Sequence, residues 1–221
     1  MSKTTALQHD QYYHIYNRGN NRETLFRQER NYHYFIQLYA KYIYPIADTF
    51  AYCLLPNHFH FLVRIKSEKE ILKARKVFTR TANGKHSSKT KETTIQQPKM
   101  KPFGFPKISS PSQYFGNLFN AYTKAINKVY GRTGSLFEKP FHRKLVTDDN
   151  YFCQLILYIH FNPQKHGLID DFRLWPFSSY AALLSEQPTR LKRDEALAFF
   201  DNREIFILQH DNYKPGELDE E

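Results

Sequence analysis

The sequence predicts an α+β fold in which an antiparallel β-sheet carries helices packed on one face. Two β-rich segments, at about 49–55 and 58–65, are separated only by a Pro-Asn pair, which is typical of a β-hairpin. Apolar residues recur at helical spacing before this hairpin, at 29–44, and after it, at 112–130. These three features place a hairpin between two helices, an arrangement that one antiparallel sheet can accommodate.

The outer elements complete the pattern. Residues 12–16 alternate and are rich in β-forming side chains, and 142–146 suits another strand that leads into a last helix. Pro45 ends the first helix, which begins at residue 28 or 29, and Gly131 ends the second. The order β-α-β-β-α-β-α describes a ferredoxin-like plan. The residues of the second helix expected to point inward are Phe115, Leu118, Phe119, Tyr122 and Ile126.

The last helix is expected at about 148–162. Asp148 or Thr147 can cap its N-terminus, and Pro163 discourages continuation beyond Asn162. One face is apolar, and Gln154, Tyr158 and Asn162 form a polar stripe at i, i+4 and i+8 along its flank. The Tyr158 hydroxyl is therefore expected beside the buried stripe, either wet at the boundary or directed at a ligand. The apolar face consists of Phe152, Leu155, Ile156 and Ile159.

His58 and His60 open the second strand of the hairpin. Residues i and i+2 of a strand point to the same face, so the two imidazoles lie side by side, while Phe59 and Phe61 face a core. Two adjacent imidazoles on a rigid strand make half of a divalent-metal site. The alternative is a pair of surface histidines on a half-buried strand.

The charge of the chain indicates a polyanionic partner. The 221 residues carry a formal charge of +10 with a pI near 9.4. Residues 64–107 contain thirteen Lys and Arg against three Glu, and 82–101 have almost no large apolar side chain. This basic stretch is either a solvated loop or a surface that neutralises DNA phosphates. We therefore expect one catalytic domain at 1–180 with a mobile basic insertion at about 67–110, followed at 181–221 by a helical extension and an acidic tail.

The compartment is expected to be a reducing one. Cys53 and Cys153 each lie in an apolar run, without the spacing of a disulfide framework or a cysteine-rich zinc site. The first eleven residues are polar and lack a signal core, and no apolar stretch is long enough for a membrane span. We expect a soluble, cytoplasmic protein that makes no use of a membrane.

Several motifs together resemble a known family. The His-Phe-His strand after Pro-Asn and the late helix with Tyr-Ile-x-x-Asn-Pro resemble the single-tyrosine HUH transposases of the IS200/IS605 kind, in particular the REP-associated tyrosine transposase branch. The match extends from about residue 10 to 180. Its other parts are His-Ile-Tyr-Asn-Arg-Gly at 14–19, Gly-Ser-Leu-Phe at 134–137, Phe-His-Arg at 141–143, Lys-His-Gly at 165–167 and Trp-Pro-Phe-Ser-Ser at 175–179.

The resemblance implies a metal-dependent endonuclease and strand-transferase that acts on single-stranded or hairpin DNA in the bacterial cytoplasm, at the nucleoid. It implies that Tyr158 is the nucleophile and forms a 5′-phosphotyrosine link. It also implies that His58, His60 and Asn162 hold one divalent ion. Mg²⁺ or Mn²⁺ suits this mixed nitrogen and oxygen set, and Mn²⁺ suits imidazole better. Gln154 is an alternative third ligand, and strand exchange with one tyrosine needs a homodimer or repeated use of the same residue.

Other residues bordering the motifs could contact DNA. Arg18, Arg132, Lys139 and Arg143 are predicted phosphate contacts, with solvated surface charges as the alternative. Unpaired bases could stack on aromatic side chains that otherwise belong to the core. His160 lies about 200° round the helix from Tyr158 and is left out of the site. The aromatic residues in question are Tyr16, Phe103, Phe105, Phe137 and Phe141.

Three classes of function are consistent with the sequence. The first is the metal-dependent single-strand nuclease and transposase. The second is a catalytically inactive DNA-binding regulator on the same fold. The third is a metal-dependent hydrolase that uses His58 and His60 without a tyrosine nucleophile.

Overall fold

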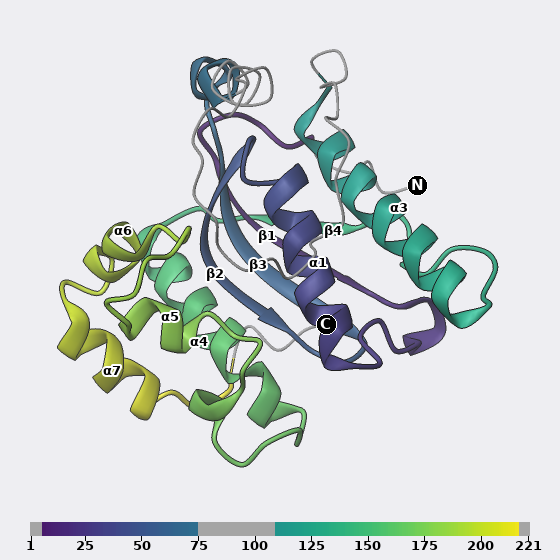
Figure 1. The fold of residues 1–221 in the computed structure, drawn as a ribbon. Coiled ribbons are helices and arrows are strands. Elements are labelled where there is room, and N and C mark those ends of the chain that lie inside the picture. The colour runs from purple at the N-terminus through teal and green to yellow at the C-terminus, as the bar shows by residue number, and fades with distance from the viewer. Residues whose placement is uncertain (1–5, 75–108, 217–221) are drawn as a thin grey trace, which may run out of the picture.

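The computed structural model describes residues 6–74 and 109–216 (Figure 1). Four strands and the helices that cover them make up this part of the chain. The strands are β1 (Tyr12–Arg18), β2 (Ala47–Leu54), β3 (His58–Ile65) and β4 (His142–Leu145). The helices are α1 (Glu29–Tyr42), α3 (Pro111–Tyr130), α4 (Asp149–Lys165), α5 (Tyr180–Leu184), α6 (Arg193–Ala198) and α7 (Arg203–Asp211), with short 3₁₀ turns at Asn20–Arg22 and Phe172–Leu174.

The strands form one antiparallel sheet in the order β2-β3-β1-β4. The predicted α+β class and its antiparallel sheet are confirmed, and the strand order is that of a ferredoxin-like plan. Strand register puts Tyr16 of β1 opposite His60 of β3 on one side and opposite His142 of β4 on the other. One row of side chains across three strands thus comes from segments far apart in the sequence.

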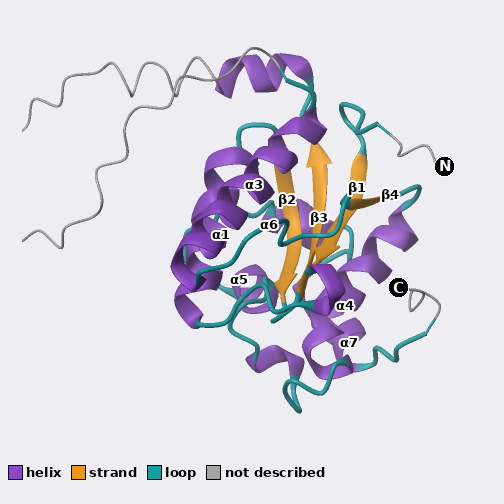
Figure 2. Ribbon diagram, turned by 90° about the vertical axis from the view of Figure 1, so that its right-hand side faces the viewer, coloured by secondary structure: helices purple, strands orange, loops and turns teal. Residues whose placement is uncertain are grey.

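Helices cover both faces of the sheet, so the prediction of helices on one face was wrong. Figures 1 and 2 show α1 and α3 on one side and α4 to α7 on the other. Phe59, Phe61 and Val63 face α1 and α3, as predicted. The opposite face has a second core, to which β2 contributes Phe50 and Cys53. The histidines of β3 made this face look polar in the sequence, so its apolar residues and the helices that pack on them were not predicted.

Helix α4 continues through Pro163 to Lys165, whereas an end at Asn162 was predicted. Pro163 has no N–H to donate to the Ile159 carbonyl, but hydrogen bonds on either side of it keep the turn helical. The Asn162 side-chain amide donates to the Tyr158 carbonyl at 2.9 Å, and the His166 N–H donates to the Asn162 carbonyl. At its start, Asp148 caps the helix by accepting from the Tyr151 N–H, as expected.

Tyr158 is buried, with 3% of its surface exposed, so its predicted position beside the buried stripe was wrong. The reason is that α4 lies between the sheet and the segment that follows it. Leu183, Phe200 and Phe206 from beyond residue 180 belong to the same core as α4. The C-terminal segment therefore contributes directly to the placement of the helix that carries Tyr158.

The helical extension expected beyond residue 180 includes two separate helices, α6 and α7. Asp201 has a left-handed φ of 67°, and the Asn202 side chain accepts from the Ile205 N–H to start α7. Trp175 and Phe177 hold the preceding segment against β2, because the indole donates to the Leu54 carbonyl and the Phe177 carbonyl accepts from the Leu54 N–H. This confirms the expected packing of 175–180 against the domain.

A buried chain of hydrogen bonds joins β2, α4 and α7. The His210 Nδ1–H donates to the Phe206 carbonyl at 2.7 Å, which leaves the His210 Nε2 as an acceptor. His160 Nδ1 lies 2.8 Å from that nitrogen, and His160 Nε2 lies 2.7 Å from the Ser179 hydroxyl. Since carbonyls only accept, the chain is satisfied when both histidines are neutral and donate through Nδ1. His160 is thus a structural residue of the second core, in agreement with its exclusion from the site.

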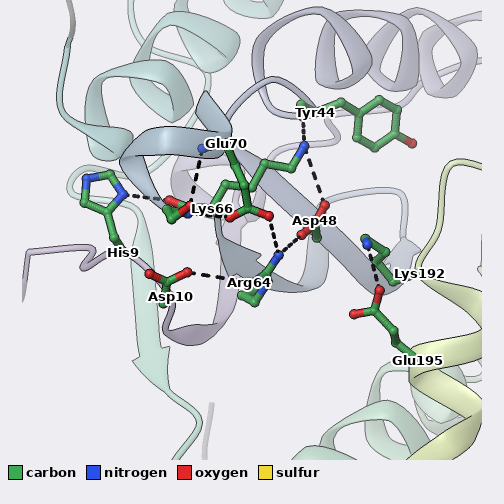
Figure 3. A network of polar contacts seen from close by, with 10 residues as sticks. His9, Asp10, Tyr44, Asp48, Arg64, Lys66, Glu70, Lys192 and Glu195 are labelled. Atoms are coloured by element: carbon green, nitrogen blue, oxygen red, sulfur yellow. Dashed lines mark hydrogen bonds and ion pairs between the residues drawn. The ribbon is translucent and has the colours of Figure 1, made fainter. Parts of the chain in front are cut away.

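At the opposite end of the sheet, Arg64 joins three segments (Figure 3). Its guanidinium lies 2.5 Å from Asp48, 3.0 Å from Glu70 and 3.7 Å from Asp10. Hydrogen bonds from Ser67, and the nearby Arg64, lower the pKa of Glu70 to about 2. This network fixes residues 68–74, which are helical and begin the predicted insertion. The remainder of that prediction, from 75 to 108, lies outside the described residues.

Two further expectations concern the described residues. Neither Cys53 nor Cys153 forms a disulfide. Among the helices of 6–74 and 109–216, none combines the length and the apolar character needed to cross a bilayer.

Burial of His210 predicts a pH-dependent stability. Burial lowers the His210 pKa to about 4, and nearby Arg173 acts in the same direction, so the unfolded chain binds this proton more readily than the folded chain below pH 6.5. The free energy of unfolding should fall by about 2 kcal/mol from this group between pH 7 and pH 5. Urea denaturation at both pH values would measure the loss in the wild type and in His210→Gln, which should lose less.

The control is His33→Gln, because the His33 side chain is 62% exposed on α1. It should keep the wild-type difference between the two pH values. Equal pH dependence of His210→Gln and the wild type would contradict the prediction.

Candidate active site

His58 and His60 point to the same side of β3, with ring centroids 5.2 Å apart and planes at 90°. The His58 Nδ1 lies 2.7 Å from the Asn57 Oδ1. An amide oxygen only accepts, so His58 donates through Nδ1 and its Nε2 carries the lone pair. Burial, followed by nearby His166, lowers the His58 pKa to about 4, and burial also lowers that of His60. Both rings are therefore neutral at pH 7, the form that binds a metal.

His14 of β1 lies directly behind the pair. It is 3% exposed, and its Nε2 is 3.0 Å from the His60 Nδ1. Burial lowers the His14 pKa to about 3. A neutral His14 that accepts at Nε2 selects the His60 tautomer with the proton on Nδ1. No local sequence pattern predicts this position of His14, because its contact with His60 depends on strand pairing across 46 residues.

Tyr158 meets this cluster from α4. Its ring lies 5.5 Å from the His60 ring and 6.1 Å from the His14 ring, edge-on to both. The Lys165 ammonium lies 5.2 Å from the centroid of the tyrosine ring. The structure thus brings together the tyrosine and the paired histidines, which are about a hundred residues apart in the sequence.

Asn162 follows Tyr158 by one turn and is fully buried. Its Oδ1 has no hydrogen bond of ordinary geometry among the described residues, and its amide is close enough to His58 to raise that pKa against the effect of burial. Neither Asn162 nor Gln154, the alternative third ligand, belongs to the described lining of the cavity, but only Asn162 interacts with His58. Asn162 is therefore the amide that the fold places at the histidine pair.

A cavity of about 750 Å³ opens onto these groups. Its described lining includes the basic side chains Arg18, Arg22 and Lys165 but no Asp or Glu. Tyr16, His142 and His166 extend it away from His58, His60 and Tyr158. The cavity offers cations and aromatic rings, a combination that suits a phosphate-linked ligand with flat bases.

The turn after β1 positions two of the cations. Asn21 and Arg22 both have left-handed φ angles, of 53° and 60°, which are costly for residues other than glycine. Gly19 begins this turn, where its N–H donates to the Asn57 carbonyl at 2.9 Å. A Cβ at Gly19 would lie only 2.0 Å from the Glu23 carbonyl oxygen, so the turn closes only around glycine. The turn is thus held in a strained form that directs Arg22 to the cavity.

Of the four predicted phosphate contacts, only Arg18 lines the cavity. Its Nε lies 2.7 Å from Glu138, and its side chain is 48% exposed. Arg132 forms an ion pair with Glu23 and a hydrogen bond with Asn127, so it holds the turn to α3. Contact with DNA stays a prediction for these residues, but the guanidinium of Arg132 is already engaged.

Arg143 and Lys139 lie elsewhere. Arg143 donates to the Ser112 hydroxyl at 2.7 Å and lies 3.9 Å over the Phe141 ring, on the α3 side of the sheet. Its neighbour His142 points to the cavity, so strand alternation sends Arg143 to the opposite face. Lys139 is exposed and lines a separate hollow of about 500 Å³ beside α3. Neither residue joins the group of Arg18, His58, His60 and Tyr158.

The aromatic residues predicted to stack on bases lie in different parts of the structure. Tyr16 lines the cavity, whereas Phe137 and Phe141 are buried in the core under α3. Phe103 and Phe105 lie outside the described residues.

The residues present could bind a divalent ion only through a mixture of imidazole nitrogens and an amide oxygen. Within 6–74 and 109–216, no three His, Cys, Asp or Glu side chains form a group that could hold a metal ion. Two neutral imidazoles and the buried Asn162 oxygen nevertheless provide three neutral donors. Such a set leaves coordination positions for phosphate oxygens and water. The donor set suits an ion that is bound together with a phosphodiester.

Comparisons with known proteins support the predicted resemblance. A Haemophilus influenzae protein named "Putative REP-associated tyrosine transposase" is 26% identical over 137 residues, which cover 62% of this chain and 60% of that protein. A solved structure described as "Structure of the REP associates tyrosine transposase bound to a REP hairpin" covers 85% of this chain and 88% of its own, with a TM-score of 0.53 and 14% identity. This chain resembles the REP-associated tyrosine transposases.

The two comparisons support different statements. The curated relative carries the sequence resemblance, although the matched region spans only about 60% of its length. The likeness to the REP-associated tyrosine transposase structure, at 14% identity, confirms the fold. No family model matches the chain.

The close approach at Gly19 predicts an asymmetry between two glycines. Gly19→Ala should lower the free energy of unfolding by about 1–3 kcal/mol or more, because the added Cβ collides with backbone. In the control, Gly116→Ala, the nearest atom lies at 3.7 Å inside α3, so the substitution should stabilise by about 0.5–1 kcal/mol. Urea denaturation would measure both variants. A Gly19→Ala protein as stable as the wild type would show that the turn can relax without cost.

Proposed function

We propose that this protein is a metal-dependent single-stranded DNA endonuclease and strand-transferase that cuts beside DNA hairpins. The observation that carries the proposal is the convergence of Tyr158 on the neutral His58 and His60 pair in one cavity. The name of the curated relative and the fold shared with a hairpin-bound transposase support the same activity. Hairpin DNA is accordingly the proposed partner of this chain.

The electrostatics of the cavity support a phosphodiester substrate. Arg18, Arg22 and Lys165 line it without an accompanying carboxylate among the described lining residues. The positive field attracts the DNA backbone and aligns it with the reacting groups. Binding of DNA phosphates releases counterions from the DNA, so the affinity should fall as salt is added.

His58, His60 and Asn162 would hold the divalent ion, Mg²⁺ or Mn²⁺. When bound, the ion withdraws charge from the non-bridging oxygens of the scissile phosphate. The side chains of the protein set the protonation state and the orientation of these ligands. Neutral imidazoles can bind a metal at pH 7 because burial disfavours their protonation. Asn57 fixes the tautomer of His58, and the His60 Nδ1 is engaged by the His14 Nε2, which leaves the His60 Nε2 for the ion.

Tyr158 is the proposed nucleophile. The phenol loses its proton to water and its oxygen attacks the phosphorus. The bond from phosphorus to the 3′ oxygen breaks, and the 3′ oxygen takes up a proton from water and leaves as a hydroxyl, so no net proton is gained or lost. The protein then carries a 5′-phosphotyrosine link that conserves the phosphodiester energy. A 3′-hydroxyl of another strand reverses the step and restores the tyrosine, so cutting and joining need no ATP. Lys165, whose ammonium lies near the ring, stabilises developing negative charge on the phenol.

The proposed nucleophile predicts a separation of chemistry from binding. Tyr158→Phe should abolish the denaturation-resistant adduct that forms when the protein is incubated with Mn²⁺ and a labelled hairpin oligonucleotide. Affinity should stay within about threefold, because only a hydroxyl is lost. Gel electrophoresis and fluorescence anisotropy measure the two quantities.

Tyr151→Phe is the matched control, since Tyr151 lies on the same helix but outside the cavity lining. It should form the adduct at the wild-type rate. Binding by the wild type without any adduct would favour a DNA-binding regulator. Strand cleavage that survives in Tyr158→Phe would favour a hydrolase that does not use the tyrosine.

The proposed ligand set predicts a loss of metal binding. His58→Ala should weaken Mn²⁺ binding by more than about 100-fold, since removal of even an outer-shell partner costs 10- to 100-fold. Calorimetry measures Mn²⁺ affinity directly, and chelation should stop cleavage until Mn²⁺ is restored.

His166→Ala is the comparison, because the His166 ring lies 4.8 Å from the His58 ring outside the proposed set. It should change Mn²⁺ affinity much less than His58→Ala. A larger loss in His166→Ala would replace one proposed ligand by His166.

A further inference from the structure

A column of stacked rings crosses the sheet beside the proposed active site. The His142 and Tyr16 rings are nearly parallel, at 12° and with centroids 4.9 Å apart. Tyr16 in turn stacks against His60, with centroids 6.0 Å apart, and its ring is tilted by 30° from that of His14 at 4.6 Å. The column follows from strand register, because Tyr16 pairs with His60 on one side and with His142 on the other. It begins at a proposed metal ligand and ends at His142.

His142 is the exposed end of this column. Its side chain is 47% exposed, whereas His14 and His60 are buried. It belongs to β4, the short edge strand of the sheet, and it lines the cavity that contains Tyr158. One ring face of His142 rests on Tyr16, so the other face is turned toward whatever the cavity binds.

We propose that His142, supported by Tyr16, is a stacking platform for one unpaired nucleobase next to the scissile phosphate. The inference rests on the proposed function and adds a base-binding site to it. Only Tyr16 separates His142 from His60, so a base on this platform belongs to a nucleotide close to the cut. Its neighbouring phosphates meet the cations of the same cavity.

The chemistry of the platform favours a base over other flat ligands. Every nucleobase has a π-face, and stacking on an aromatic side chain contributes without reading the sequence. Arg18 and Arg22 line the cavity for the attached phosphates, and no carboxylate lines the described part of it to repel them. A free aromatic molecule would use the ring but would make no use of these cations.

The platform also has a fixed geometry. Tyr16 is half-buried between the histidines of β1, β3 and β4, so its ring is held by strand pairing. Glu138 lies 3.8 Å from the His142 Nε2 and limits rotation of the imidazole. A ring that is held before the ligand arrives loses little freedom on binding.

The test couples one side chain to one base. The hairpin oligonucleotide used for adduct formation is prepared with an abasic site at each single-stranded position beside the stem in turn, and anisotropy gives the affinity of each. His142→Ala should weaken binding of the intact oligonucleotide about 5- to 100-fold. One abasic position should weaken wild-type binding by a similar factor and should not weaken His142→Ala further.

Two controls accompany this test. His142→Phe keeps an aromatic face and should retain wild-type affinity and the sensitivity to the same abasic position. His33→Ala removes an exposed histidine outside the cavity lining and should bind as the wild type does. Circular dichroism of each variant establishes that the fold is retained.

The platform is overturned if no abasic position is coupled to His142, or if His142→Phe loses as much affinity as His142→Ala. Failure of the proposed function has a different signature, namely a wild-type protein that forms no covalent adduct with the unmodified oligonucleotide. Base coupling without an adduct would therefore uphold the platform and reject the nuclease.

Discussion

Antiparallel pairing of β3 with β1 is the constraint on which the candidate site depends. It brings the His14 Nε2 to within 3.0 Å of the His60 Nδ1 and stacks Tyr16 against His60. Burial in this layer disfavours a charge on the imidazoles, so the fold keeps them neutral at pH 7 and available as donors. A slip of one residue between these strands would turn His58 and His60 to the α1 side and replace them with phenylalanines. The register of β3 against β1 thus determines which side chains form the candidate site.

The second requirement is a helix held from both sides. On one side α4 packs on β2 and β3, and on the other it meets the segment beyond residue 180. The hydrogen-bond chain through His160 and His210 joins these layers two residues after Tyr158. The chain ties α4 to α7 through His210 and to β2 through Ser179, which bonds to Tyr52. The C-terminal segment, which the sequence presented as an extension, therefore helps to determine where the tyrosine lies.

Local patterns predicted the elements and the shared face of His58 and His60, because periods of two and 3.6 residues assign side chains to faces. The grouping of Tyr158 with these histidines was implied by the family resemblance and by no local period. Local patterns did not predict the second core, since the histidines of β3 made that face look polar. His14 was missed because its partner is 46 residues away and no local period connects them. The position of Arg143 could have been predicted: alternation along β4 puts it opposite His142, and His142 lies in the cavity. Proximity to a motif in the sequence was a weaker guide than the face of the strand.

Acidic residues beside the cavity order the basic side chains of this region by pairing with them. Glu138 pairs with Arg18, and Glu23 pairs with Arg132, yet neither carboxylate belongs to the described lining. Glu23 also closes the turn in which Gly19 admits no side chain and Arg22 takes a left-handed conformation. Glu138 and Glu23 thus hold in place the arginines and the turn that border the cavity. A phosphate that enters the cavity meets basic side chains that are already oriented. The exposed Arg18 can exchange its contact with Glu138 for a contact with the phosphate.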